Sequence, residues 1–284
     1  GGVLAMAFSP NFDNDDTVFA IVTGKAGTDS AVGTHLRAES DTTVHNWGSF
    51  INDAHFVDTR TIPSTYVVAE RACIAFAEDF NSVPAAFVGL MNAAGDGDAY
   101  RVDMVKGTIG TSAVQDLNIR GVDTQTNVGS IDVAGPASSA YILAGLCNLS
   151  NTGSMSSWQG QVHYSANGGE TWLQSYKPPS GMDFATQRTA AIVLMAPDFD
   201  PNDPGAVAYC SNGFIERGTN GMFSGFYVSV TEGTTWNGRG LLDHTIDPAM
   251  GDSIQDIVPS PDYDNDSTLF MVTRWSGLGL LWES

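Results

Sequence analysis

Two groups of closely spaced aspartates suit a hard cation. In the group near the C-terminus, the carboxylates alternate along SPDYDND, which is the spacing of the first ligands in an EF-hand calcium loop. Ser267 stands where that loop needs glycine and Thr273 where it needs glutamate, so this segment is not an EF-hand. Hydrogen-bonded turns and weak extracellular calcium sites both stay open for these segments. The six aspartates are Asp13, Asp15, Asp16, Asp262, Asp264 and Asp266, and no other cofactor is expected.

Other catalytic motifs are missing from the sequence. The five histidines show no HExxH spacing, and there is no GxSxG segment, P-loop or GxGxxG after a strand. A glycosidase needs only two carboxylates at the right separation, and thirty-two acidic residues leave that reaction open. Because the acids gather in turns, where a solvated loop explains them, we expect the chain to have no enzymatic activity.

A short turn motif occurs twice. It reads Ser/Thr, x, Asp/Asn, x, Gly, x, Thr, Trp; SANGGETW matches it, and SVTEGTTW matches it with Thr231 in the acidic slot. The polar third residue hydrogen-bonds the turn backbone, glycine supplies a positive φ, and tryptophan fills apolar space between sheets. Only the outer Ser and Trp survive in a third copy, residues 40–47. The motif residues are Ser165, Asn167, Gly169, Thr171 and Trp172, then Ser229, Gly233, Thr235 and Trp236.

The chain repeats one pattern of apolar strand, acidic turn with an aromatic residue, and apolar strand. The aromatic residues Phe12, Phe80, Phe199 and Tyr263 are separated by 68, 119 and 64 residues, so one copy is missing from the middle gap. Residues 128–147 supply it in degenerate form, without the acidic turn. Stacked repeats form a core that no single unit can bury alone. The five units span residues 1–69, 70–127, 128–188, 189–253 and 254–284, and the last is incomplete.

Each repeat is predicted to form four antiparallel strands. Short runs rich in Val, Ile, Phe and Tyr end at Gly, Pro, Asn and Asp, and no segment keeps a helical period. Four antiparallel strands repeated about a centre make a β-propeller blade, which leaves only short edges. We therefore expect an all-β chain, a β-propeller of four-stranded antiparallel blades with a repeat of about 64 residues. A row of small β-sandwiches is the alternative, although each would have a thin core.

Composition excludes some partners and favours a location. The formal charge of −20 repels nucleic acid and anionic membrane surfaces, and no uncharged run reaches the roughly 20 apolar residues of a membrane-spanning helix. Only three lysines are present, and Asp, Asn, Thr, Ser and Gly fill the polar positions, which suits an extracellular or cell-surface protein. The three cysteines are too few and too dispersed for a disulfide framework or a metal site.

These segments resemble the BNR/Asp-box β-propellers, a broad set that includes sialidases, sortilin-type receptors and photosystem II assembly factors. More narrowly, SPNFDNDDTVFA, GDAYRVDMV, VHYSANGGETW and SPDYDNDSTLFMVT resemble repeat-rich S-layer or cell-surface proteins of anaerobic Chloroflexi-type bacteria. The resemblance covers nearly the whole chain. It implies a secreted propeller in which the Asp box is part of the scaffold, on the outer part of each blade.

The same resemblance supplies a test for sialidase chemistry. A sialidase needs three converging arginines, a Tyr/Glu nucleophile pair and an Asp acid/base, with the first arginine in an Arg-Ile-Pro motif. Here Thr61 interrupts that motif in Arg60-Thr-Ile-Pro63, and nine arginines are scattered over five units. The tryptophans and tyrosines are able to make a sugar-stacking platform, although blade core explains them as well.

The last blade of the predicted propeller ends before its outer strand. Third strands end in VHYS, FYVS and LWES, and the last of these stops at Ser284, where the Asp box would begin. A blade without its outer strand leaves an unpaired edge. We therefore expect a piece of a larger surface protein or a processed chain whose open edge serves assembly. The leading hypothesis is a non-enzymatic extracellular structural protein of an S-layer, sheath or similar assembly. Its partners are expected to be copies of itself or the rest of a larger surface protein. A glycan-binding or glycan-hydrolysing propeller and a partner-binding assembly factor are the alternatives.

Overall fold

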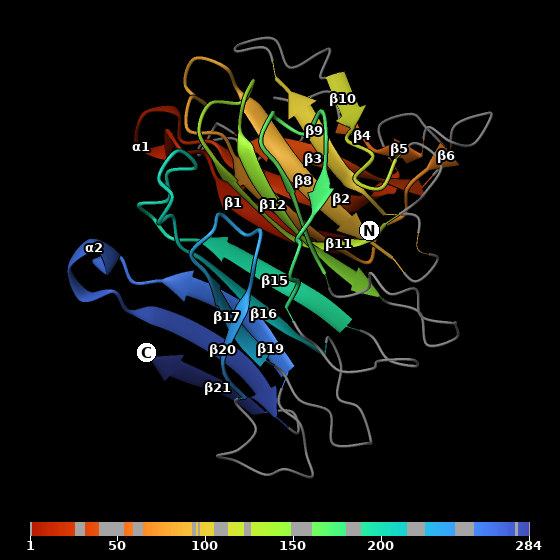
Figure 1. Cartoon of the computed structure of the whole chain (residues 1–284). Helices are drawn as coiled ribbons and strands as arrows, with labels where there is room; N and C mark the ends of the chain where they lie inside the picture. Colours follow the sequence, from red (N-terminus) through yellow and green to blue (C-terminus); the bar gives the residue numbers. More distant parts are fainter. Residues whose placement is uncertain are drawn as a thin grey trace. The chain divides into compact units, whose positions relative to one another are not determined.

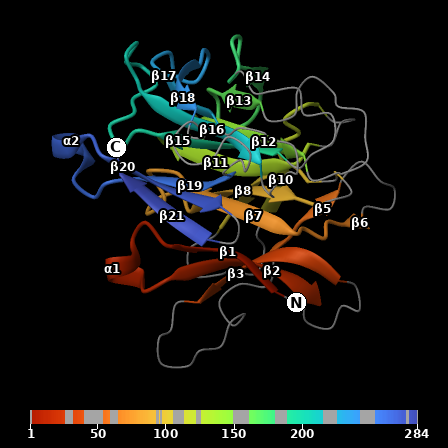
Figure 2. The ribbon, with the colours of Figure 1, turned by 90° about the horizontal axis from the view of Figure 1, so that it is seen from below.

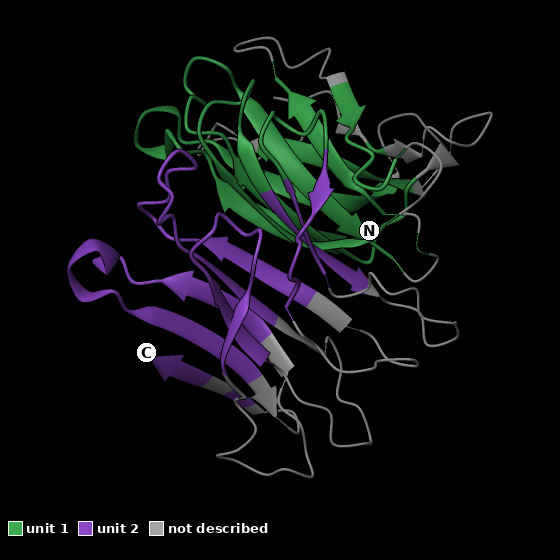
Figure 3. Ribbon diagram, viewed as in Figure 1, with its two compact units in different colours: residues 1–142, 165–171 green, residues 143–164, 172–284 purple. Residues whose placement is uncertain are grey.

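The computed structural model divides the chain into two compact units, which are described separately (Figure 3). The first holds residues 1–142 and 165–171, and the second holds residues 143–164 and 172–284. The division therefore passes through the third repeat. The structure describes residues 2–25, 32–39, 54–58, 65–92, 95, 97–104, 113–121, 126–148, 161–179, 189–214, 225–241, 253–275 and 278–283.

Short antiparallel strands make up the first two blades (Figures 1 and 2). The first sheet is β1 (Gly2–Phe8), β2 (Val18–Lys25), β3 (Val32–Glu39) and β4 (Ala54–His55). The hairpin of β5 (Val57–Asp58) and β6 (Thr65–Tyr66) follows it. The second sheet is β7 (Arg71–Phe76), β8 (Ala85–Met91), β9 (Ala99–Asp103) and β10 (Ala113–Asp116).

The remaining blades follow the same order. The third is β11 (Val128–Ala134), β12 (Tyr141–Asn148), β13 (Val162–Ser165) and β14 (Leu173–Gln174). The fourth is β15 (Thr189–Met195), β16 (Ala208–Phe214), β17 (Gly225–Ser229) and β18 (Asn237–Leu241), and the end of β12 pairs with the start of β15. The fifth has three described strands, β19 (Ser253–Pro259), β20 (Leu269–Trp275) and β21 (Leu278–Glu283).

The predicted fold class is confirmed: the chain is an all-β β-propeller built from antiparallel four-stranded blades. Among the described residues, helix is confined to α1 (Phe12–Asp15) and α2 (Tyr263–Asp266), one turn each. Both lie in acidic turns, and each ends on a residue in the left-handed conformation, Asp16 and Ser267. A single turn followed by a left-handed residue reverses the chain between two strands.

The strand directions give each blade two different edges. We name the strands of a blade A to D in chain order. Because neighbours are antiparallel, the A–B turn and the C–D hairpin leave from one edge, called here the turn edge. The B–C connection and the D–A connection to the next blade leave from the opposite edge, called here the loop edge. The acidic turns and the Asp boxes therefore share the turn edge.

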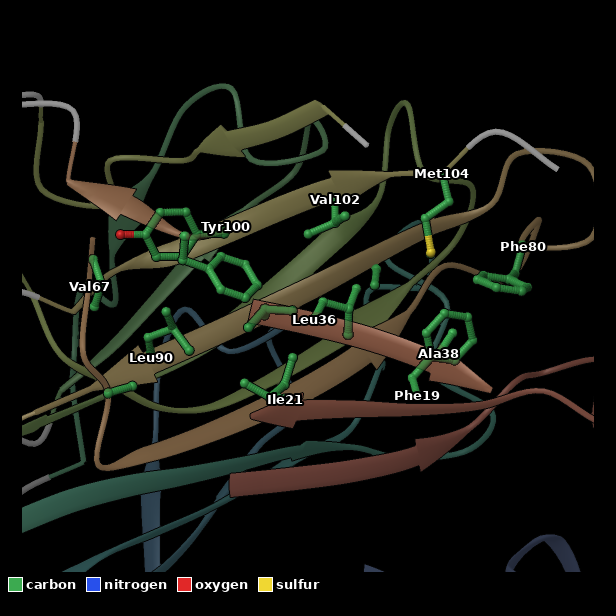
Figure 4. Close-up of a cluster of buried hydrophobic side chains, with 14 residues drawn as sticks. Phe19, Ile21, Leu36, Ala38, Val67, Phe80, Leu90, Tyr100, Val102 and Met104 are labelled. Atoms are coloured by element: carbon green, nitrogen blue, oxygen red, sulfur yellow. The ribbon is translucent and has the colours of Figure 1, made fainter. Parts of the chain in front are cut away.

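The core of the first unit lies between the first and second blades (Figure 4). Phe19 and Ile21 of β2 and Leu36 of β3 are buried, and Ala72, Ile74 and Phe76 of β7 pack against the cluster that they form. Phe80 in the acidic turn of the second blade completes this interface. Its ring centroid lies 5.8 Å from that of Phe19 and 5.1 Å from that of Phe76.

The acidic-turn aromatic residue joins one blade to the blade before it. In the second unit, Tyr263 of the fifth blade contacts Tyr209 of β16, with ring centroids 6.4 Å apart and a hydrogen bond between the two hydroxyls. Phe80, Phe199 and Tyr263 are all buried. Reading the acidic turns as solvated loops is therefore incomplete, because their aromatic residues are packed between blades.

Candidate functional site

The first Asp box closes the C–D hairpin of the third blade through its own side chains. The Ser165 hydroxyl accepts the Gly169 N–H at 3.0 Å and lies 2.9 Å from the carboxamide oxygen of Asn167, to which it donates. That oxygen also accepts the Thr171 N–H at 3.0 Å, while the carboxamide nitrogen donates to the Thr171 hydroxyl at 2.9 Å. Asn167 in the acidic slot of the motif thus supplies one acceptor oxygen and one donor nitrogen to the turn.

The second Asp box uses hydroxyls for the same contacts. The Gly233 N–H donates to the Ser229 hydroxyl at 2.9 Å, and the Thr235 N–H donates to the Thr231 hydroxyl at 3.0 Å. The Thr231 and Thr235 hydroxyls lie 2.7 Å apart and are hydrogen-bonded. In both motifs the polar side chains form hydrogen bonds within the turn itself. Neither motif therefore presents side chains arranged for catalysis.

Each Asp box also rests on the outer strand of the preceding blade. A Cβ on Gly169 would come within 2.9 Å of the Leu117 side chain, which directly follows β10. The corresponding residue after β14 is Ser175, whose hydroxyl donates to the Gly233 carbonyl at 2.6 Å and accepts the Trp236 indole N–H at 3.2 Å. Glycine is favoured at Gly169 because its φ of 91° lies in a region that other residues rarely adopt, and the Leu117 tip packs against its Cα.

The acidic turns of the first and last blades close through one aspartate each. Asp266 accepts the Ser260 hydroxyl and the Thr268 N–H, both at 2.8 Å. The same two contacts hold Asp15 in the first blade, at 2.8 and 2.9 Å. The Thr268 N–H, and then the Ser260 hydroxyl, lower the pKa of Asp266 from its ordinary value because they stabilise the carboxylate.

Three of the six predicted calcium ligands form hydrogen bonds within their turns, and the other three are exposed. Asp15 and Asp266 close their turns, and Asp262 accepts the Asn265 amide at 2.6 Å. In the part of the chain that the structure describes, no group of three or more His, Cys, Asp or Glu side chains is arranged to hold a metal ion. Calcium binding by the six aspartates stays a prediction. Asp13, Asp16 and Asp264 are exposed.

A buried amide network fixes the loop edge between the first three blades. The Asn127 carboxamide oxygen accepts the N–H groups of Asn92 at 3.1 Å and Gly97 at 3.2 Å, and its nitrogen donates to the Asn92 carbonyl at 2.7 Å. The Asn92 side chain donates in turn to the Val68 carbonyl at 3.2 Å. Three successive connections, two D–A and one B–C, are thereby bonded to one another.

Close backbone packing reinforces this network. A Cβ on Gly97 would lie 2.1 Å from the Leu90 carbonyl oxygen, so only glycine fits there. Beside it the buried Asp98 carboxylate accepts the N–H groups of Ala99 at 2.8 Å and Ile119 at 3.3 Å. Asn92, Asp98 and Asn127 were not predicted from the sequence. Their only signal was a cluster of Asn, Asp and Gly after an apolar strand, which reads as an ordinary turn.

Two arginines flank the amide network. Arg71 is exposed at the start of β7, where its register partner Met91 directly precedes Asn92. Arg120 lies in the D–A connection that follows β10 and is partly buried, which lowers the pKa of its guanidinium from the ordinary value. Arginine stays protonated at neutral pH in proteins, so Arg120 is a cation. The loop edge of the second blade thus carries two cations.

Other side chains that were considered for chemistry belong to the core. His35 and His163 are buried, and both take part in interactions within the protein. Among the aromatic residues, Tyr100, Tyr141 and Tyr227 are buried and so form no exposed stacking platform. The cysteines are free thiols, and burial raises the pKa of two of them, Cys73 to about 12 and Cys210 by more.

Several predictions fall outside the described residues. The degenerate box at 40–47, the interrupted arginine motif at 60–63 and Ser284 are among them, as are the side chains of Trp47, Trp158 and Trp275. The repeat boundaries also stay a prediction. Within the described residues, no helix is long and apolar enough to cross a membrane.

Comparison with known proteins finds relatives in structure only. No family model and no curated protein matches the sequence. A protein of unknown function from Dyadobacter fermentans covers 99% of this chain and 74% of its own, with 11% identity and a TM-score of 0.47. A glucose dehydrogenase covers 100% and 81%, with 12% identity and a TM-score of 0.46. A Trypanosoma rangeli sialidase in complex with sialic acid covers 99% and 45%, with 13% identity and a TM-score of 0.45.

These similarities concern the fold and assign no activity to the chain. A sialidase and an exo-1,5-alpha-L-arabinanase are among the structures that resemble it. The expected likeness to surface-layer proteins of Chloroflexi-type bacteria has no support from a family model or a curated sequence.

The prediction that the chain is not an enzyme is contradicted. The similar structures include a sialidase, a polysaccharide lyase and an arabinanase, at 8–13% identity. The prediction rested on the lack of local catalytic motifs. Catalytic residues are disproportionately carried on loops held by a rigid scaffold, and a pair of carboxylates from separate loops has no sequence signature.

Proposed function

We propose that this chain is a glycan-binding or glycan-hydrolysing β-propeller that recognises acidic sugars at the loop edge of its blades. The observation that carries the proposal is that strand direction places both Arg71 and Arg120 at the loop edge of the second blade. Guanidinium groups bind carboxylates through paired, charge-assisted hydrogen bonds. A fixed backbone around them lowers the entropy lost when a sugar is bound.

The distribution of charge supports the loop edge over the turn edge. Eleven carboxylates and no basic residue stand in the five A–B turns, so those turns repel an anionic ligand. Six of the nine arginines stand in or directly beside B–C and D–A connections by sequence position. Three of them, Arg60, Arg188 and Arg217, lie outside the described residues. The six are Arg60, Arg71, Arg120, Arg188, Arg217 and Arg274.

The proposal includes a location outside the cell or at its surface. The acidic composition and the small number of lysines, three, support it. No catalytic residue is assigned among the described side chains.

A glycan array followed by titration calorimetry tests the proposal. The array contains sialylated glycans, uronic-acid polymers and neutral arabinan, because a sialidase, a polysaccharide lyase and an arabinanase resemble the chain in structure. We expect acidic glycans to bind and arabinan not to bind. Arg71→Gln and Arg120→Gln should each weaken binding roughly 10-fold to 100-fold, the value of a hydrogen bond to a charged group.

A matched control separates the site from the overall charge. Arg239 is exposed within strand β18 and stands in neither a B–C nor a D–A connection, so Arg239→Gln should leave the affinity unchanged. Thermal unfolding of Arg120→Gln shows whether the partly buried position still folds. Release of reducing sugar from the bound glycan distinguishes hydrolysis from binding alone. Binding of neutral and acidic glycans with equal affinity, or of none, would reject the proposal.

A further inference from the structure

Pairs of aromatic residues occupy equivalent places in the two compact units. Between the first and second blades the pair is Phe19 and Phe80, whose rings meet edge to face at 5.8 Å and 86°. Between the fourth and fifth blades it is Tyr209 and Tyr263, at 6.4 Å and 76°. Phe19 and Tyr209 are equivalent by register, because the residue before each pairs with the final residue of the A strand. Two phenylalanines thus satisfy this packing, and the tyrosine hydroxyls are additional to it.

The two phenol groups of the tyrosine pair point toward one another. The hydroxyls of Tyr209 and Tyr263 are hydrogen-bonded, so the ring carbons next to each hydroxyl also lie close together. In a tyrosyl radical the unpaired electron is shared between the oxygen and these ortho carbons. Two radicals formed at this pair are therefore held within reach of carbon–carbon coupling, and such prior positioning favours the reaction.

Both rings are held in place by their surroundings. The ring of Tyr209 stacks on that of Phe226, with centroids 6.0 Å apart and planes 13° apart. The backbone of Tyr263 is fixed on both sides, since its N–H donates to the Ser260 carbonyl at 3.1 Å and its carbonyl accepts the Ser267 N–H at 2.8 Å. Both tyrosines belong to the second compact unit, so their contact is formed within one unit.

We propose that Tyr209 and Tyr263 are an oxidative modification site, at which a dityrosine bond joins the fourth blade to the fifth. The oxidant is hydrogen peroxide acting through a haem peroxidase. Each phenol loses one electron and one proton, and the two radicals couple through their ortho carbons. The hydrogen on each of these carbons then moves to the oxygen of its own ring. The peroxide takes up the two electrons and the two protons and becomes two molecules of water.

The neighbouring thiol does not compete for the oxidant. Cys210 follows Tyr209 on β16, and successive side chains of a strand point to opposite faces of the sheet. The thiol is buried, and burial raises the pKa of Cys210 above its ordinary value. Because the thiolate is the reactive form, this cysteine stays inert while the tyrosines are oxidised.

Peroxidase treatment followed by tryptic mass mapping tests the proposal. Cleavage after arginine places the two tyrosines in the peptides 189–217 and 240–274, and neither peptide contains a second tyrosine. The treated chain, isolated as a monomer from a denaturing gel, should show dityrosine fluorescence. Its digest should contain the two peptides joined, with a mass lower than their sum by two hydrogen atoms. A treated monomer in which the two peptides stay separate overturns the proposal.

The controls separate the folded contact from chance coupling. Oxidation in urea keeps both tyrosines but removes the contact, so the joined peptides should be lost. Tyr209→Phe and Tyr263→Phe should each lack them, whereas Tyr176→Phe, at an exposed tyrosine of the same unit, should retain them. The same yield of joined peptides from the folded and the urea-unfolded chain would also overturn the proposal.

Discussion

The indole N–H of Trp236 donates to the Ser175 hydroxyl at 3.2 Å, and this bond joins the Asp box of the fourth blade to the outer strand of the third. The same hydroxyl donates to the Gly233 carbonyl at 2.6 Å. Both partners are buried, Trp236 at 1% exposure. A motif usually treated as a turn signature therefore contributes to the interface between blades.

Removal of the Ser175 hydroxyl should destabilise the second unit. Ser175→Ala leaves the buried indole N–H and the Gly233 carbonyl without this partner, which costs roughly 1 to 3 kcal/mol. Urea unfolding followed by tryptophan fluorescence measures the change. Leu173→Ala, at an exposed position of the same outer strand, is the control and should change the free energy of unfolding little. Equal losses for both variants would contradict a specific role for the hydroxyl.

Two equivalent positions in the Asp boxes should respond in opposite ways. Gly168 and Glu232 both have positive φ, of 68° and 55°. Gly168→Ala places a Cβ 2.9 Å from the Ala137 carbonyl oxygen and should destabilise by about 1 to 3 kcal/mol. Glu232→Gly relieves the strain of a side chain in the left-handed region and should stabilise by up to about 1 kcal/mol. Thermal melts that show the same sign for both variants would contradict this explanation.

Much of the fold follows from residue patterns that act locally. Alternating apolar runs ended by Asp, Asn, Gly and Pro predict strands and turns, and the 64-residue spacing of the two Asp-box tryptophans predicts the repeat. Contacts made by another blade leave no local signal. Phe80 and Tyr263 look like loop residues until the B strand of the preceding blade packs against them. Trp172 and Trp236 are identical in their motifs, yet Trp236 is buried and Trp172 only half-buried.

The loop edge could not be derived from the sequence for the same reason. Asn92 and Asn127 are 35 residues apart and meet only because the B–C and D–A connections leave from one edge of the sheet. The same holds for the arginines, which look scattered in the sequence. Only the strand directions show that Arg71 and Arg120 lie at that edge.

The amide network should be costly to interrupt. Asn127→Ala removes the acceptor for two buried N–H groups and the donor to the Asn92 carbonyl, so the loss should be at least about 3 kcal/mol, since each of the three unsatisfied groups costs about 1 to 3. Asn127→Asp keeps the acceptor and loses the donor. Its loss of unfolding free energy should be smaller at a pH where the introduced acid is protonated, because the O–H then donates to the Asn92 carbonyl. Hydrogen exchange at Asn92 and Gly97 reports the opening directly. Unchanged exchange at both amides in Asn127→Ala would show that the network does not hold the loops.

Acid should weaken the turn that Asp266 closes. Its pKa is lower in the folded chain than the ordinary value of 3.8, so folding favours the carboxylate. The stabilisation is fully present above that ordinary value and is lost as pH falls through the folded pKa. Unfolding measured between pH 7 and pH 2 should therefore show a smaller acid loss for Asp266→Asn than for the unaltered chain. An acid loss for Asp266→Asn equal to that of the unaltered chain would contradict this role of the carboxylate.

The central claim is that the ligand binds at the loop edge. Hydrogen exchange with and without the strongest glycan from the array tests it most directly. Amides of Asn92, Gly95, residues 97–98 and residues 117–121 should gain protection, and those of the acidic turns at residues 9–17 and 260–268 should not change. Protection confined to the acidic turns, or no protection at a saturating glycan concentration, would contradict the assignment.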